Sequence, residues 1–340
     1  LAVAAGRHRT LTAVFRPEGS GIHYIPDDFA SISEALAADN VYDGDTIYLR
    51  DGTYMFEQVK DEATGYWCLG AVRKGVAVTS GGRTNAVLDC ATAGGLIIDH
   101  KDSVLSNVSI RNFHSKTNSP ALHLLNGVAS NIYVNGSVAA GMHAGSPYVV
   151  YVGPGGLVTD SDFHNLRKTA WDSSTIMQVT GGTVRRTTIR NFESNCRALR
   201  SWAGGAKRAR FENCTIAGNS CYYVVGIDAS GTDLADCVFR NNWCSDQQPG
   251  MGLFGNTTLT RCVITNNAAG GTCPLITCGT DSTACMTNCL VANNTISQYG
   301  VFKLAGKNAK LDLCNVTVAH NKTTSSSYAG GITGDGASAG

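Results

Sequence analysis

Apolar and polar residues recur along this chain in a pattern whose period is about 26 residues. The clearest copies are residues 211–216, 234–239, 259–264 and 286–291, and each has a cysteine at its fourth position. Five weaker copies align with these cysteines on Val108, Ile132, Ser161, Thr187 and Val316. We call these nine aligned positions the anchor column, and together they extend the repeat over most of the chain.

At three further positions of the repeat, the same type of residue, apolar or polar, stands in every copy. The residues three before and two after the anchor are apolar throughout, whereas the residue just before it is always polar. The polar column consists of Asn107, Asn131, Asp160, Arg186, Asn213, Asp236, Arg261, Asn288 and Asn315. Such alternation is typical of a strand with one buried face. Each copy therefore predicts one short strand, and the strands are expected to stack as a parallel sheet around a shared core.

Asparagines follow the predicted strands at a nearly fixed place. They are Asn112, Asn165, Asn191, Asn219, Asn242, Asn267, Asn294 and Asn321. Asparagine tolerates the left-handed backbone conformation that a sharp corner needs. The column therefore predicts a stacked asparagine ladder at one corner of a three-sided coil.

Residues 25–36, 44–49 and 51–54, together with the repeat, resemble the right-handed parallel β-helix (pectin-lyase-like) superfamily. Within it, the rows Cys-x-Ile/Val/Phe-x-x-Asn are most similar to polymorphic-outer-membrane-protein-like surface repeats of bacteria. The resemblance implies an all-β fold, a right-handed single-stranded parallel β-helix. Ser31 and Glu34 have the spacing of a capping box, which predicts a short helix over the first coil. The fold hosts lyases, hydrolases, esterases, adhesins and fibre proteins, so it indicates no single function.

The repeat and the resemblance together predict four parts of the chain. We expect an N-terminal extension over 1–20, a cap and first coil over 21–60, and coils over 61–327. Residues 328–340 form a Gly- and Ser-rich end that is typical of a linker or a truncation. The first six residues end in small side chains, which fits the tail of a secretory signal and fits an arbitrary boundary equally well.

Composition and charge narrow the class of protein. Apolar residues make up 43% of the chain and charged residues 16%, which is below the ~25% usual in globular domains. The 27 Lys and Arg residues against 26 Asp and Glu residues give a net charge of +1, so nothing favours a nucleic-acid partner. No apolar run approaches the ~18 residues of a transmembrane helix. A β protein without a transmembrane segment is expected.

The 13 cysteines are an odd number, so at least one thiol has no partner within the chain. Four of them occupy the anchor column, where the strand spacing permits disulfides without requiring them. We expect two other disulfides, Cys221 with Cys244 and Cys68 with Cys90. This cysteine usage favours a secreted protein that is extracellular or at the cell surface.

Neither a metal nor a cofactor is predicted from the sequence. The cluster Cys273, Cys278, Cys285 and Cys289 lacks a Cys-x₂-Cys spacing and a nearby histidine, which argues against zinc. Calcium is compatible with the fold but has no supporting motif. The motifs of galacturonan hydrolases, pectate lyases and pectin esterases are also missing, so no acid–base pair can be assembled from them.

Candidate chemistry is confined to a basic segment. Residues 160–212 contain ten Lys and Arg residues against five Asp and Glu residues. The proposed register places Asp160 beside Arg186, and His164 beside Arg190, on adjacent coils. One interpretation is a groove for an acidic polysaccharide, because arginine recognises carboxylates and tryptophan offers a platform for a sugar ring. The alternative is an ordinary surface with weak ion pairs.

Under the groove interpretation, the ligand-binding residues would be Arg167, Trp171, Arg186, Arg190 and Trp202. The base for β-elimination would be Lys168, His164 or Arg190.

Two functions remain open at this point. The first is a non-catalytic extracellular or cell-surface β-helix, an adhesin, passenger or fibre module, which associates end to end through exposed strand edges. The second is a polysaccharide lyase or carbohydrate-binding protein that acts on an acidic polysaccharide or a host or cell-surface glycan. The missing catalytic motifs favour the first.

Overall fold

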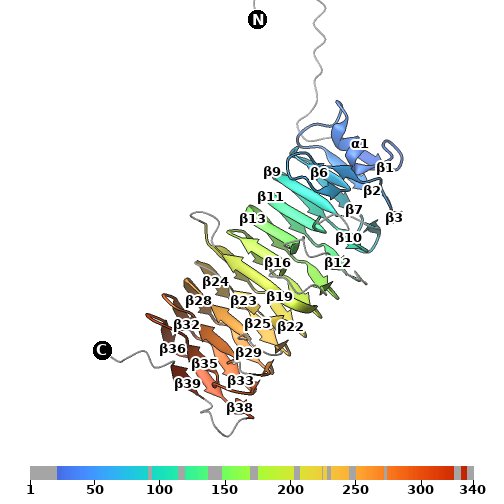
Figure 1. The fold of residues 1–340 in the computed structure, drawn as a ribbon. Coiled ribbons are helices and arrows are strands. Elements are labelled where there is room, and N and C mark those ends of the chain that lie inside the picture. The colour runs from blue at the N-terminus through green and yellow to red at the C-terminus, as the bar shows by residue number, and fades with distance from the viewer. Residues whose placement is uncertain are drawn as a thin grey trace, which may run out of the picture.

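The computed structural model describes residues 21–90, 94–113, 119–136, 148–168, 175–202, 207–223, 225–227, 231–244, 250–271, 274–324 and 331–334. Its coils stack into an elongated rod, with α1 at the N-terminal end and β39 at the far end (Figure 1). The spacing between coils is about 27 residues. Every strand pairing among the described residues is parallel except that of the β4–β5 hairpin. The predicted all-β parallel solenoid is confirmed.

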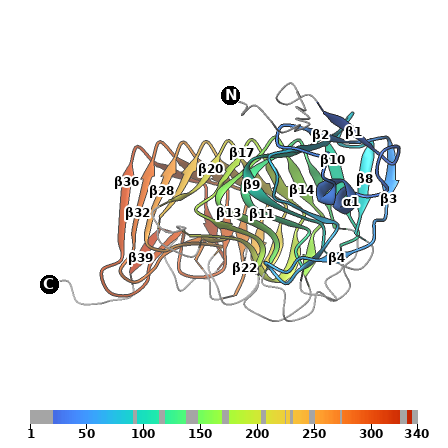
Figure 2. The ribbon, with the colours of Figure 1, turned by 90° about the horizontal axis from the view of Figure 1, so that it is seen from above.

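The strands fall into four columns along the rod, and Figure 2 shows neighbouring coils side by side. The first column consists of β6 (Gly70–Val72), β9 (Leu96–Ser106), β11 (Leu122–Ser130), β13 (Tyr148–Thr159), β16 (Thr175–Thr180), β19 (Glu193–Trp202), β23 (Val225–Ile227), β27 (Met251–Leu253), β31 (Ile276–Cys278), β35 (Phe302–Leu304) and β39 (Ile332–Gly334). The second consists of β1 (Ile22–Ile25), β2 (Thr46–Leu49), β7 (Ala77–Ser80), the later parts of β9, β11 and β13, and then β17 (Thr183–Arg185), β20 (Ala209–Glu212), β24 (Thr232–Ala235), β28 (Asn256–Thr260), β32 (Thr283–Thr287) and β36 (Lys310–Cys314).

The third column is a separate 11-stranded sheet. It consists of β3 (Gly52–Tyr54), β8 (Ala86–Asp89), β10 (Val108–Arg111), β12 (Tyr133–Asn135), β14 (Asp162–His164), β18 (Thr188–Arg190), β21 (Thr215–Ala217), β25 (Val238–Arg240), β29 (Val263–Thr265), β33 (Leu290–Ala292) and β37 (Thr317–Ala319). The fourth, of very short strands, consists of β15 (Arg167–Lys168), the start of β19, β22 (Ser220–Tyr223), β26 (Trp243–Cys244), β30 (Ala268–Ala269), β34 (Thr295–Ile296) and β38 (Lys322–Thr323). Each of the later coils therefore has four short strands, whereas the sequence predicted a coil with three sides.

The polar column before the anchor has a different role from the predicted one. All nine of its residues have a positive φ between 46° and 57°, so each is a left-handed corner between a second-column strand and a third-column strand. The prediction of one continuous strand was wrong at this point. A single left-handed residue redirects the chain while its side chain stays outside, and a polar residue suits that place as well as it suits the outer face of a strand.

The predicted core columns are confirmed in the first eight copies. The apolar residues on both sides of the corner are at most 1% exposed there, as in Phe211 and Ile216. The corresponding residues of the last copy, Leu313 and Val318, are 38% and 43% exposed. The core is thus continuous along the rod, and its last described coil is covered on one side only.

The asparagine column divides into two structural roles. Asn112, Asn165 and Asn191 are left-handed corners themselves. In the five later coils the corner lies one residue earlier, at Gly218, Asn241, Asn266, Asn293 and His320. The asparagine that follows each of these corners joins a hydrogen-bonded ladder. Asn267, for example, accepts bonds from the backbone N–H of Asn242 at 3.0 Å and from its Nδ2 at 2.9 Å.

The predicted N-terminal cap is present as α1 (Ile32–Ala37). The Ser31 hydroxyl accepts a hydrogen bond from the Glu34 backbone N–H at 3.1 Å, as the capping-box spacing requires. Ile32 is fully buried, and its side chain packs against Gly70 of β6, where a Cβ atom would lie 3.1 Å from it. The helix thereby covers the open end of the first coils.

Candidate functional site

The structure places the described residues of the basic segment on different faces. Arg186 is a corner residue, and its guanidinium holds Asp160 at 2.6 and 2.7 Å. Arg190 lies on β18 of the third column and binds Asp162 at 2.9 Å. Trp202 ends β19 in the first column. The expected neighbours Asp160 and Arg186 therefore meet, but Arg186 and Arg190 are each paired with a carboxylate and do not form one groove with Trp202.

Three other residues with a predicted role in binding or catalysis lie partly or wholly outside the described residues. Arg167 and Lys168 form the backbone of β15, which pairs with Glu193 and Ser194 of β19. Their side chains, and the whole of Trp171, lie outside the described residues. Their predicted roles in binding and catalysis stay predictions.

His164 lies beside Arg190 in register, as expected. It is buried, and its ring packs on Tyr133 with 4.4 Å between the ring centroids. Burial lowers the pKa of His164, and its Nε2 atom is buried without a hydrogen-bond partner. A buried imidazole with a lowered pKa is a weak proton acceptor at neutral pH, so this geometry favours a packing role.

An aromatic cluster that the sequence did not single out lies on the outside of the first column. His123 of β11 stacks on Tyr151 of β13, with 4.8 Å between ring centroids and 16° between ring planes. Tyr66 meets the edge of His123 at 5.3 Å. The Tyr148 hydroxyl lies 3.0 Å from the Tyr66 hydroxyl and 3.4 Å from His123 Nδ1. Two neighbouring strands and one hairpin loop thus meet at one imidazole.

The β4–β5 hairpin, formed by Val59–Lys60 and Trp67–Cys68, positions the Tyr66 side of this cluster. The Asp61 backbone N–H donates to the Tyr66 carbonyl at 2.8 Å, which closes the turn. Arg73 binds the Asp61 carboxylate through both of its terminal nitrogens, at 2.5 and 2.9 Å. The hydrogen bond from Arg73 lowers the pKa of Asp61 to about 2. The turn that carries Tyr66 is therefore anchored by a buried carboxylate that is ionised at neutral pH.

A polar row continues from this cluster along the rod. The register aligns His123 with Tyr151, Tyr151 with Gln178, and Gln178 with Arg200. Each of these four residues lies between two buried first-column residues, so its side chain points outward. The Arg200 guanidinium lies 4.2 Å from the ring centroid of Trp202. We call the surface formed by His123, Tyr151, Gln178 and Arg200 the first-column face.

The electrostatics of this face favour binding over proton transfer. Burial lowers the pKa of His123 to about 4, so its imidazole is neutral at pH 7. Burial also raises the pKa of Tyr148 above its ordinary value. A neutral imidazole and a neutral phenol can donate and accept hydrogen bonds, but both are poorly placed to remove a proton from a sugar carbon. Aromatic rings beside a few fixed polar groups are typical of ligand sites.

Sequence reasoning missed this face because it followed the anchor column. The first-column face also repeats once per coil, at His123, Tyr151, Gln178 and Arg200. In this column the sequence has no cysteine that marks the register. Aligning the apolar pairs that flank them, such as Leu122 with Leu124 and Met177 with Val179, would have revealed the row. Tyr66 belongs to a hairpin outside the repeat and gave no signal.

Comparison with known proteins bears on the fold. Residues 142–285 match the family model described as a right handed beta helix region. The matched segment is 144 of the 340 residues, and it agrees with the parallel β-helix fold of the structure. No curated protein sequence matches this β-helix. The narrower resemblance to polymorphic-outer-membrane-protein-like repeats stays a prediction.

Several solved structures are similar to this β-helix at low sequence identity. The A-module of the mannuronan C-5 epimerase AlgE6 of Azotobacter vinelandii is 11% identical, with 86% of this chain and 91% of that chain covered and a TM-score of 0.41. The catalytic domain of a GH87 α-1,3-glucanase is 12% identical, with coverages of 97% and 70% and a TM-score of 0.46. PfbA, a surface adhesin of Streptococcus pneumoniae, is 10% identical, with coverages of 86% and 77% and a TM-score of 0.38. Likenesses of this degree carry no argument about function.

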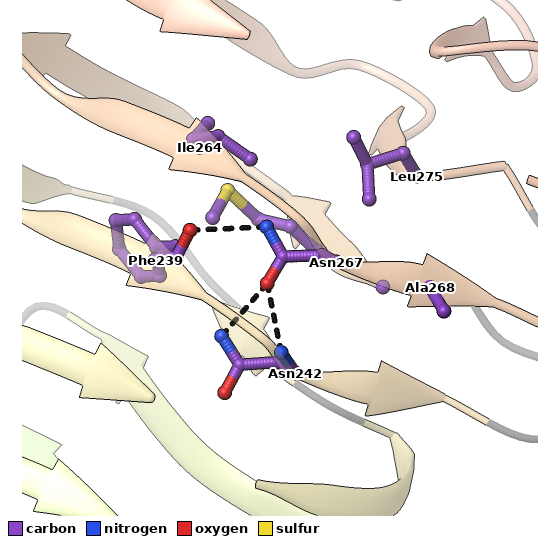
Figure 3. A pocket seen from close by; sticks show the side chains of 8 residues that line it. Phe239, Asn242, Ile264, Asn267, Ala268 and Leu275 are labelled. Carbon is purple, nitrogen blue, oxygen red and sulfur yellow. Dashed lines mark hydrogen bonds between the residues drawn. The ribbon is translucent and has the colours of Figure 1, made fainter. Parts of the chain in front are cut away.

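A small pocket lies between neighbouring coils in the described part of the chain (Figure 3). Its volume is about 20 Å³, and Phe239, Ile264, Leu275 and the ladder residues Asn242 and Asn267 are among the side chains around it. A space of this size holds a single water molecule at most. It is a packing defect beside the ladder rather than a ligand site.

Both predicted disulfides stay predictions. Cys68 and Cys90 are buried, and the structure has no bond between them. Burial raises the pKa of Cys68 to about 11, which keeps its thiol protonated. Cys221 and Cys244 are register partners on β22 and β26, as expected, but the side chain of Cys221 lies outside the described residues.

The described residues contain neither a metal-binding cluster nor a membrane-spanning helix. Within the described ranges, no group of three or more His, Cys, Asp or Glu residues is arranged to hold a metal ion. No helix in that part of the chain is long and apolar enough to cross a membrane.

Proposed function

We propose that this protein is a non-catalytic β-helix of the cell exterior that binds a polysaccharide along its first-column face. The observation that supports it best is the cluster of Tyr66, Tyr148 and Tyr151 around His123, continued along the rod by Gln178 and Arg200. A linear polymer suits such a row, because neighbouring coils present side chains at intervals of about 4.8 Å.

The chemistry of the row favours an acidic polysaccharide. Tyr151 is partly exposed and offers a ring face, whereas Gln178 offers an amide. Arg200 adds a cation at the end of the row that enters the basic segment, and arginine is suited to carboxylate groups. At the other end Trp67 is 40% exposed beside the Tyr66 turn. The face thus combines aromatic platforms with a positive end.

Turnover is the less supported function. Of the described titratable groups around the cluster, His123 and Tyr148 are poor bases for the reasons given above, and Arg73 is held by Asp61. Lys74 donates to the carbonyls of Ala38 and Val41, both at 3.0 Å, and so is turned toward the N-terminal coil. None of these four side chains is therefore well placed to accept a proton from a sugar, as the base of a uronate lyase must.

Affinity electrophoresis in gels containing alginate, pectate or a glycosaminoglycan tests the binding face. We expect at least one of these polymers to retard the wild-type protein. Tyr151→Ala should weaken retardation at least tenfold in apparent Kd. Trp243→Ala, which removes an exposed aromatic ring from the fourth column, should leave it unchanged. Equal retardation of both variants, or none with any polymer, would overturn the proposed face.

End-to-end association through the rod is a second part of the proposal. Leu313 and Val318, an apolar pair of the last described coil, are 38% and 43% exposed. A second copy that packed its own coil on these side chains would bury them. Light scattering at increasing concentration should show growing particles, and Val318→Lys should suppress that growth. Particles of constant monomeric mass over the whole range would contradict the association.

A further inference from the structure

Four cysteines form a continuous file in the interior of the β-helix. Cys214, Cys237, Cys262 and Cys289 occupy the same anchor position in four successive coils, each just before a third-column strand. All four are at most 3% exposed, and all four are unbonded in the structure.

Backbone hydrogen bonds hold these coils in strict register on both sides of the file. Val238 donates to the Cys214 carbonyl, Val263 to that of Cys237 and Leu290 to that of Cys262, each at 2.9 Å. Parallel strands in such a ladder lie about 4.8 Å apart. That separation falls within the Cα range of about 4.4–6.8 Å that a disulfide requires.

The four thiols have matching surroundings. Each donates to the carbonyl two residues before it in the chain, and the Cys262 backbone N–H donates to Cys289 Sγ at 3.4 Å. Each thiol also faces a carbonyl of the preceding coil, as Cys237 Sγ faces Phe211 at 3.5 Å. The same thiol-to-carbonyl contact thus repeats in four successive coils.

We propose that these thiols are an oxidation site, and that they pair as Cys214–Cys237 and Cys262–Cys289 to give two disulfides that join four successive coils. A file of four neighbours can pair completely in only one way, first with second and third with fourth. The other neighbouring pair, Cys237–Cys262, would leave both end thiols without a partner in the file.

The reaction is thiol–disulfide exchange with an external disulfide such as oxidised glutathione. A cysteine thiolate attacks one sulfur of the oxidant and releases one glutathione thiolate, which leaves a mixed disulfide. The neighbouring cysteine thiolate then displaces the second glutathione. Each new bond thus oxidises two protein thiols, reduces one external disulfide to two thiols, and transfers two protons to them.

Interaction between neighbouring thiols also makes one member of a pair easier to ionise. The Cys237 thiol lowers the pKa of Cys214, and the Cys214 thiol raises the pKa of Cys237. Because the folded coils exclude an oxidant from the file, exchange would take place while the coils close or when they open locally. The pairing does not depend on polysaccharide binding.

Peptide mapping by mass spectrometry without reduction tests the pairing. The full chain is refolded with a mixture of reduced and oxidised glutathione, digested, and analysed for linked peptides. We expect links joining Cys214 to Cys237 and Cys262 to Cys289. A link between Cys237 and Cys262, pairing of these cysteines with others, or four free thiols after refolding would overturn the proposal.

Cys237→Ser provides a matched test of the pairing order. Serine should be tolerated in this column, because Ser161 occupies it, buried, in an earlier coil. We expect the variant to free one thiol, that of Cys214, and to keep the link between Cys262 and Cys289. Circular dichroism establishes that it has folded. If Cys237–Cys262 were the true pair, Cys214 and Cys289 would both be free in the wild type, so a free Cys289 before the substitution would contradict the proposed order.

Discussion

Asparagine has two separate roles in this molecule, and backbone conformation distinguishes them. Asn266 is an exposed left-handed corner with a φ of 55°. The next residue, Asn267, is buried and donates to the Asn294 Oδ1 atom and to the Phe239 carbonyl, both at 3.0 Å. The first role needs a backbone that few residues adopt, whereas the second needs an amide side chain.

Removing a ladder asparagine should therefore cost far more than changing a corner asparagine. Asn267→Ala leaves the backbone N–H and the side-chain amide of Asn242 without their buried acceptor. We expect it to lower the free energy of unfolding by about 3 kcal/mol. Asn266→Gly keeps an allowed left-handed corner and should change it by less than about 0.5 kcal/mol. Urea unfolding followed by circular dichroism measures both, and equal losses would contradict the division of roles.

His123 gives the molecule a specific dependence on pH. Its pKa is about 4 in the folded protein, against an ordinary value of 6.5. Between these values the unfolded chain binds more protons than the folded chain, so stability falls as the pH falls from 6.5 toward 4. Between pH 7 and 4.5 this contribution amounts to about 2 to 3 kcal/mol.

The variant His123→Gln removes that contribution and should be less sensitive to acid than the wild type over the same range. Urea unfolding at pH 7 and at pH 4.5 measures the difference for each protein. If the wild type and the variant lost the same free energy of unfolding between the two pH values, His123 would not be a buried neutral imidazole.

At the scale of the strands, the sequence predicted the core well because burial repeats in every coil. Val291 and its counterparts must be apolar wherever another coil stacks above and below. The corners were harder to predict, because a polar residue suits both an outward strand position and a left-handed corner. Arg186 and Arg261 occupy corners in this column, although arginine carries none of the preference for that conformation that asparagine shows.

A matched pair of substitutions tests the contribution of stacking. Val291 is fully buried, and its register partner on the last described coil, Val318, is 43% exposed. Val291→Ala should lower the free energy of unfolding by about 2 kcal/mol, because it leaves a cavity in the core. Val318→Ala should lower it by less than about 0.5 kcal/mol. Similar losses in chemical denaturation would mean that the last coil is covered in solution.

At the scale of the whole molecule, the candidate site depends on contacts that no periodic pattern contains. Tyr66 reaches His123 from a hairpin outside the repeat, and Arg73 fixes that hairpin through Asp61. The basic segment was visible in the sequence, but the structure distributes its described arginines over several faces and pairs Arg186, Arg190 and Arg208 with carboxylates. Only Arg200 and Trp202 bring that charge and an aromatic ring to the first-column face.

The central claim is that this β-helix binds an acidic polysaccharide on the first-column face and leaves the polymer intact. Size-exclusion chromatography after a long incubation tests both parts, because it reports the length of the polymer and the protein that travels with it. We expect the wild-type protein to elute together with the full-length polymer and the Tyr151→Ala variant to elute alone. A shortened polymer, or co-elution of the variant to the same extent as the wild type, would contradict it.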